Sequence, residues 1–268
     1  MEPNERLAAV RDGMTVMYER VARLIEEQDD LSMMIPGFEW TVREMAVHLA
    51  GGIRRYTALA NGEYDLSALT FDKKMLDARA RGLNADNPEA DPKKLAEQIR
   101  EGFELFMSVT AKVPAETPVS YYNGLRPNVA EIASVLLGEP VIHGYDIGTG
   151  VGAPWRIDPE YSVLFLGVFQ KFGCSALFQP DRASGLDATY RVDIPGTEST
   201  FVRIVDRTCR EVPADGPADC VISADPVTAH LVYTGRMKQW PAIALGQLTF
   251  SGARPEIGPG FFDLFVCP

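Results

Sequence analysis

The stretch that decides the fold is NVAEIASVLLGEPVIHGYDIGTG, residues 128–150. It opens at Asn128 and carries Glu131 three residues later, which is the pattern of a capped helix start. Further along, His143 follows Glu139 by four residues. On a helix this spacing places both side chains on one face, one turn apart, where a carboxylate and an imidazole can bind one divalent ion.

A second predicted helix supplies a third candidate ligand. The segment WTVREMAVHLA, residues 40–50, begins with a Thr41–Glu44 capping box and carries His48. Two histidines and one carboxylate leave coordination positions open for water or substrate, which is typical of a catalytic metal site. The spacing also allows a plainer interpretation, in which Glu139 and His143 form a surface pair and His48 is a satisfied core histidine.

The rest of the first part also has the pattern of helices. Apolar residues recur at spacings of three and four over residues 5–29 and 91–113, and a further helix is expected at 159–178. The last two begin with an Asp-Pro pair, a helix cap followed by the residue best suited to the first helical position. A short helical piece is expected at 73–81. These segments predict an N-terminal four-helix bundle with additional helices.

The composition changes after residue 181. Apolar and polar residues alternate over 186–194, 199–206 and 218–225, and a last strand is expected at 247–252. Two short helices are expected before that strand, the first capped by Asp225. The fold class is therefore α plus α+β. We expect two domains, residues 1–180 and 181–268.

The overall composition excludes several classes of function. The chain has 268 residues, a net charge of -11 and a pI of about 4.8, whereas broad binding to nucleic acid or to an anionic membrane needs a basic face. No apolar run is long enough to span a bilayer, and the first residues do not resemble a secretory signal, so a cytoplasmic location is expected. The cysteines are scattered, which favours reduced, buried thiols. They are Cys174, Cys209, Cys220 and Cys267.

Two segments resemble a known family. FEWTVREMAVHLAGG at 38–52 and GEPVIHGYDIGTGVG at 138–152 are similar to the mycothiol-dependent maleylpyruvate isomerase family, within the DinB-like group of metal-binding four-helix bundles. The resemblance implies metal ligands at His48, Glu139 and His143. The segment at 220–252 resembles the small α+β domain, related to sterol carrier proteins, that many members append. Both domains in the right order make this resemblance more specific than either segment alone.

The chain departs from the family pattern beside the predicted ligands. Pro140 removes a backbone donor next to Glu139, which predicts a kink or a new helical segment at that point. Ile147 stands where the family has leucine, a change without expected consequence. Asp146 lies three residues after His143 and can orient it by accepting its other ring N–H. The alternative is that Asp146 is only a charged residue near a helix end.

Three arginines are further candidates. Arg54 and Arg55 follow His48 by one to two turns and could bind a substrate carboxylate, but a solvated pair on an exposed helix face is the better interpretation. In the isomerase family an arginine of the second domain contributes to activity. Arg236 is the candidate here, placed to reach a cleft between the domains. The neighbouring His230 is expected to be structural.

The resemblance implies an enzyme that depends on a divalent metal, with zinc as the expected ion, and that uses mycothiol as co-substrate. A divalent ion lowers the pKa of a bound thiol, and the thiolate adds to an electrophilic small molecule. If the double bond rotates and the thiolate then leaves, the outcome is isomerisation. If the sulfur stays attached, the outcome is S-transfer. Two alternatives are a carrier of a small apolar ligand with a vestigial metal site, and a hydrolase that uses metal-bound water. No nucleic-acid or membrane partner is expected, and the protein is expected to be a monomer or homodimer.

Overall fold

The computed structural model describes residues 1–71, 73–214 and 216–265. The chain divides into two compact units. The first comprises Met1–Thr70 and Lys74–Ile157, and the second comprises Phe71–Lys73 and the chain from Asp158 onward. The first is helical and the second holds a small mixed sheet, as the sequence predicts. Among the helices described, none has the length and apolar character needed to cross a membrane.

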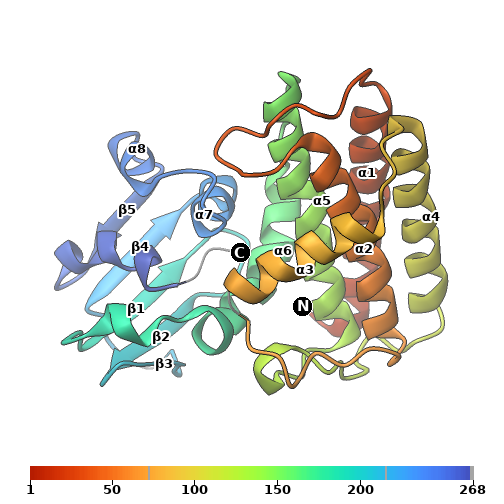
Figure 1. Ribbon diagram of the computed structural model, residues 1–268. Helices are drawn as coiled ribbons and strands as arrows, with labels where there is room; N and C mark the ends of the chain where they lie inside the picture. Colours follow the sequence, from red (N-terminus) through yellow and green to blue (C-terminus); the bar gives the residue numbers. More distant parts are fainter. Residues whose placement is uncertain (72, 215, 266–268) are drawn as a thin grey trace. The chain divides into compact units, whose positions relative to one another are not determined.

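Four long helices build the first unit. They are α1 (Pro3–Glu26), α2 (Val42–Ala60), α4 (Pro92–Thr110) and α5 (Val129–Val151), with the shorter α3 (Lys73–Asp86) between α2 and α4 in the chain. Helix α1 packs against α4 and α5, and α2 packs against the same two helices, so the four form a bundle (Figure 1). This is the bundle that the periodicity of the sequence predicts.

The helices begin where the capping residues predict. Thr41 and Glu44 exchange side-chain and backbone hydrogen bonds at the start of α2, and Asn128 and Glu131 do the same at the start of α5. Each such box satisfies backbone donors that the first turn leaves without partners. Asp91 caps α4 by accepting from two backbone N–H groups. The helices that carry His48, Glu139 and His143 are therefore fixed at their N-termini by local sequence.

The predicted apolar stripe of α1 fills the bundle interior. Every one of its members is buried: Leu7, Val10, Met14, Met17, Val21 and Leu24. Burial of such a side chain contributes about 1.5–3 kcal/mol relative to its exposure to water. None of these residues belongs to the candidate metal site, so the core of the bundle does not depend on that site.

Helix α5 continues through Pro140, so the new helical segment given as one possible outcome does not begin there. Proline lacks an N–H group, and the carbonyl of Leu136, four residues earlier, loses its helical donor. The hydroxyl of Tyr18, on α1, donates to that carbonyl at 3.4 Å. Tyr18 is 1% exposed and holds this position deep in the bundle. A tertiary hydrogen bond thus replaces the local one, and Glu139 keeps its helical relation to His143.

The second unit is a five-stranded sheet with helices. Its strands lie in the order β3-β2-β1-β4-β5, with β1 and β4 parallel and the other neighbours antiparallel. The strands are β1 (Ala188–Asp193), β2 (Thr200–Val205), β3 (Thr208–Glu211), β4 (Cys220–Ala224) and β5 (Leu248–Ser251), and the helices are α6 (Pro159–Phe172), α7 (Pro226–Tyr233) and α8 (Gln239–Ala244). All the predicted strands are present. The sequence gives no sign of β3, which has only four residues with mostly exposed side chains.

Helix α6 belongs with the sheet, not with the bundle. Phe165 and Phe169 lie in the same apolar core as Tyr190 and Ile222 of the sheet. The boundary between the compact units accordingly falls at Ile157, ahead of α6, instead of near residue 180. Apolar periodicity shows that a helix has a buried face, but it carries no information about which neighbour covers that face.

Three of the four cysteines lie in the described part of the second unit. All three are free thiols: Cys220 is buried, and Cys174 and Cys209 are half-buried. A hydrogen bond with Cys174, together with burial, raises the pKa of Cys209. A raised pKa disfavours the thiolate, so Cys209 is not set up as a nucleophile. Cys267 lies outside the described residues.

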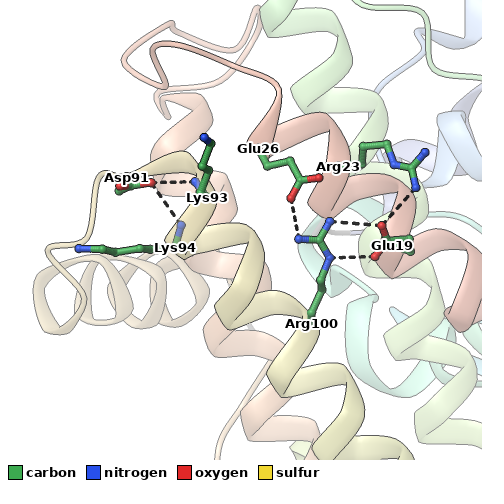
Figure 2. Close-up of polar contacts among 7 residues, drawn as sticks. All are labelled: Glu19, Arg23, Glu26, Asp91, Lys93, Lys94 and Arg100. Atoms are coloured by element: carbon green, nitrogen blue, oxygen red, sulfur yellow. Dashed lines mark hydrogen bonds and ion pairs between the residues drawn. The ribbon is translucent and has the colours of Figure 1, made fainter.

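An arginine on α4 ties that helix to α1 at the surface of the bundle. Arg100 forms two contacts with Glu19, at 2.8 and 3.2 Å, and a third with Glu26 at 2.6 Å (Figure 2). Arg23 adds a contact to Glu19 at 3.4 Å. Hydrogen bonds from Arg100 are the main cause that lowers the pKa of both Glu19 and Glu26. Planar, multidentate pairing of this kind is the strongest form of surface ion pair.

We expect Arg100→Gln to lower the free energy of unfolding at pH 7 by about 1 kcal/mol, since the cluster is one-third to one-half exposed. Because the pKa values of the two glutamates are lowered on folding, the stabilisation is complete above the unfolded value of about 4.3. It is lost as the pH falls through the folded values. Urea unfolding of both proteins from pH 7 to pH 3 should show the difference shrink. The exposed pair Arg54–Glu101 offers the control, and an equal effect of Arg54→Gln would contradict the prediction.

Candidate metal site

The structure brings the three predicted ligands together inside the bundle. His48 comes from α2, and Glu139 and His143 come from α5. The Nε2 atoms of the two histidines lie 3.1 and 3.3 Å from the same carboxylate oxygen, Oε2 of Glu139. One ligand atom from each of the three residues lies within 4.8 Å of the ligand atoms of the other two. The side chains keep 13–24% of their surface exposed, so the cluster remains open to solvent.

Rings and a carboxylate hold the histidines in place. The His48 and His143 rings meet edge to face with centroids 5.0 Å apart, and Trp40 lies 5.4 Å from the His48 ring. Nδ1 of His143 lies 2.9 Å from Oδ2 of Asp146, which is 3% exposed. Asp146 is therefore a buried partner of His143, which argues against the alternative that it is only a charge near a helix end.

The donor set suits a cation. The Nδ1 and Nε2 atoms of His143 face two different carboxylates, yet a neutral imidazole carries only one ring hydrogen. With that hydrogen on Nδ1, directed at Asp146, the Nε2 lone pair points toward the Glu139 carboxylate. Such an arrangement is repulsive unless a proton or a metal ion lies between the two atoms. Two Nε2 atoms and one carboxylate oxygen at this spacing are a ligand set that zinc commonly takes.

The charges of the cluster are strongly coupled. Burial would raise the pKa of Glu139, but hydrogen bonds from His143 and His48 outweigh it and hold that pKa well below its usual range. Burial lowers the pKa of His48. For His143 the effect of burial is overcome by Asp146 and Glu139, which raise its pKa. Glu139 therefore favours its ionised form and His48 its neutral form, which are the states that metal ligands need, whereas the raised pKa of His143 favours its protonated form.

The second unit contains Arg236 and His230, which the sequence also singled out. Arg236 follows α7, and its Nη1 donates to the carbonyl of Thr234 at 2.5 Å. Its catalytic role stays a prediction. His230 is fully buried. Its Nδ1 atom lies 3.1 Å from the Ser162 hydroxyl oxygen, and its ring stacks on the Phe165 ring with centroids 4.4 Å apart. Burial, followed by the charge of Arg236, lowers the pKa of His230 to about 3, as suits a core histidine.

Several tyrosines near the site were not anticipated from the sequence. The charge of Glu139 contributes to raised pKa values at Tyr18, Tyr56, Tyr121 and Tyr122, although burial is the main cause at each. Tyr121 and Tyr122 lie in the loop between α4 and α5. That loop is held by backbone hydrogen bonds to residues 66–69, which precede α3. No sequence pattern links these segments, because their pairing is decided by the packing of the bundle.

Comparison with solved structures supports the fold of the whole chain. A histidine-to-alanine mutant of the mycothiol-dependent maleylpyruvate isomerase matches with 16% identity and a TM-score of 0.58, over 94% of this chain and 93% of that one. The unmutated mycothiol-dependent maleylpyruvate isomerase matches with 17% identity and a TM-score of 0.53, over the same shares. At such identities the likeness concerns the fold alone. A comparison with curated proteins gives no match.

A family model covers the bundle. The mycothiol maleylpyruvate isomerase N-terminal domain matches residues 10–148, which is more than half of the chain. The matched segment contains His48, Glu139 and His143, the residues that converge in the structure. The chain belongs to the mycothiol maleylpyruvate isomerase N-terminal domain family.

Proposed function

We propose that the protein is a metal-dependent enzyme that uses mycothiol to isomerise an electrophilic small molecule or to form an S-conjugate with it. The observation that carries the proposal is the convergence of His48, Glu139 and His143 in a partly exposed cluster. The family to which the chain belongs takes its name from mycothiol and maleylpyruvate. Zinc is the proposed ion, because two imidazoles and a carboxylate with open positions form a typical catalytic zinc site.

The residues of the chain have separate tasks in this proposal. When bound, the ion would lower the pKa of a thiol and so supply a thiolate near neutral pH. Asp146 accepts the Nδ1 hydrogen of His143, which fixes the ring and directs its Nε2 lone pair into the site. Glu139 contributes one negative charge, so a dication there would keep a net charge of about +1 to attract an anion. Trp40 shields one side of His48.

The chemistry then follows from the electrophile. The thiolate sulfur adds to one carbon of a conjugated double bond, and the electron pair of that bond moves to the conjugated acceptor. Rotation about the resulting single bond and departure of the sulfur give the isomer and regenerate the thiolate. If the sulfur stays and the carbanion takes a proton, the product is a thioether. The carrier and hydrolase alternatives differ from both, because neither needs a thiol.

The test is calorimetric titration of the zinc-loaded protein with mycothiol in two buffers of different ionisation enthalpy. We expect a buffer-dependent heat that corresponds to release of about one proton per thiol bound at pH 7, since binding converts thiol to thiolate. S-methylated mycothiol is the matched control, because it keeps the shape of the ligand and has no proton to release. Absence of thiol binding, or binding without proton release, would favour the carrier or the hydrolase.

A further inference from the structure

We propose that Cys174 and Cys209 form a redox-active pair of thiols that the disulfide form of a low-molecular-weight thiol oxidises to an intramolecular disulfide. Both cysteines belong to the second unit, whereas the candidate metal ligands belong to the first. The inference goes beyond the proposed function and does not rest on it. It assigns to the second unit a modification site with its own chemistry.

The register of the sheet directs Cys209 toward the core of the second unit. Cys209 lies in β3 directly opposite Ile204 of β2. Side chains directly opposite each other on neighbouring antiparallel strands point to the same face of a sheet. Ile204 is fully buried, in the core that also contains Phe165 and Phe169 of α6. The Cys209 side chain therefore faces the side of the sheet against which α6 packs.

Cys174 reaches the same place from the end of α6. That helix continues into a short π-helical segment, η2 (Gly173–Leu177), which carries Cys174 and packs against β3. Cys174 and Cys209 pack against the same apolar core, and their thiols form a hydrogen bond with each other. Burial raises the pKa of Tyr233, and the charges of both cysteines add to that effect, so both sulfurs lie near one hydroxyl. The two sulfurs are thus neighbours in the reduced protein.

An arginine in the turn before β3 holds that strand beside the chain that follows α6. Arg207 donates from Nε to the carbonyl of Pro180 at 3.2 Å and forms an ion pair with Asp181. Pro180 follows Cys174 by six residues, and Arg207 precedes Cys209 by two. A disulfide requires Cβ atoms about 3.5–4.5 Å apart, and this tether limits how far the two segments separate.

Access distinguishes this pair from Cys220. Strand β3 is at the edge of the sheet and most of its side chains are exposed. Cys174 and Cys209 are half-buried, so a small reagent can reach them. Cys220, in contrast, lies in β4, between β1 and β5, and is 0% exposed. Because oxidation of a cysteine depends on its exposure, the pair should react while Cys220 stays reduced.

The direction of the hydrogen bond decides which sulfur reacts first. The raised pKa of Cys209 keeps the proton on that sulfur, so Cys209 donates and the Cys174 sulfur accepts. Nucleophilic attack on a disulfide needs a sulfur without its proton. Cys174 is therefore placed to attack the small disulfide, and Cys209 is placed to complete the exchange.

The exchange has two balanced steps. In the first, the deprotonated Cys174 sulfur attacks one sulfur of the small disulfide and bonds to it, the original S–S bond breaks, and the other half leaves and takes a proton. In the second, the Cys209 sulfur loses its proton and attacks the Cys174 sulfur, and the second small thiol leaves with a proton. Two protein thiols are oxidised, and one small disulfide is reduced to two thiols.

The new bond would join the end of α6 to the edge strand of the sheet. It would close a loop over positions 174–209. A cross-link restricts the unfolded chain, and it does so more strongly for a longer loop. We therefore expect oxidation to raise the thermal unfolding midpoint of the second unit by about 5 °C or more.

The experiment uses glutathione disulfide as the oxidant, added to the zinc-loaded full-length protein near pH 8, where ordinary thiols are partly ionised. Remaining thiols are alkylated and the protein is digested without reduction, so that mass spectrometry identifies the linked cysteines. We expect a Cys174–Cys209 link and a raised unfolding midpoint, both reversed by dithiothreitol. Cys209→Ser should stop after the first step and keep glutathione on Cys174. Cys220→Ala is the matched control and should form the link like the wild type.

The proposal is overturned if the wild type forms no link between Cys174 and Cys209, or if either of them links to Cys267 instead. It is also overturned if Cys209→Ser carries glutathione on Cys220 and none on Cys174, because the order of attack and the difference in access would then both be wrong. The peptide map of the wild type needs no substitution, so it decides the question even if Cys209→Ser does not fold.

Discussion

The variant His143→Ala should lose its zinc and all thiol-dependent activity while the bundle stays folded. The ligand cluster shares no residue with the apolar stripe of α1, so the core keeps its packing. Removal of a ligand also leaves the ionised Glu139 with one imidazole fewer. We expect a loss of metal affinity well beyond the roughly 10- to 100-fold loss that follows removal of a group hydrogen-bonded to a ligand. The measurements are elemental analysis after dialysis against a chelator of known affinity, and circular dichroism for the helices.

Asp146→Asn provides the graded comparison. It keeps the shape of the side chain that holds Nδ1 of His143 but removes its charge. The expected loss of zinc affinity is about 10- to 100-fold, smaller than for His143→Ala. His48→Ala should behave like His143→Ala, since both contribute one Nε2 atom. Full zinc occupancy in both histidine variants would show that the ion, if present, is held elsewhere.

Gly144→Ala should cause the largest loss of stability among single methyl additions in the first unit. A Cβ atom at Gly144 would stand 2.0 Å from the Trp155 ring. That ring is fixed by a hydrogen bond from Nε1 to the carbonyl of Val141 at 3.0 Å and by the Arg20 guanidinium, 3.9 Å from the ring centroid. Relief of the clash requires movement of Trp155, so we expect a loss of about 3 kcal/mol or more, at the upper end for overpacked sites.

The control for Gly144→Ala is Gly82→Ala. Gly82 also lies inside a helix, α3, but nothing approaches the point where its Cβ atom would be. Alanine there should stabilise the protein by about 0.5–1 kcal/mol, because it restricts the unfolded chain. Chemical denaturation of both variants gives the comparison. A loss below about 1 kcal/mol for Gly144→Ala would mean that Trp155 is free to move, contrary to its contacts.

The helices of the first unit and the shared helix face of Glu139 and His143 could be predicted because their signals are local. The Thr41–Glu44 and Asn128–Glu131 boxes mark helix starts within four residues, and the spacing of Glu139 and His143 fixes their shared face whatever surrounds them. His48 was harder, since its place opposite α5 depends on bundle packing. It was assigned through the resemblance of segments 38–52 and 138–152 to the family, not through spacing.

What the sequence determined by itself was therefore the set of elements, their caps, the apolar faces and the chemistry that two helices carry. Only the tertiary structure decided how those faces were covered: α6 buries Phe165 in the core of the sheet, Tyr18 supplies the hydrogen bond that Pro140 cannot, and the loop that carries Tyr121 and Tyr122 pairs with residues 66–69. The physical reason is range. Capping and helical periodicity act between residues up to four apart, whereas the partner of a buried face or of an unpaired carbonyl is chosen by packing between segments far apart in the chain.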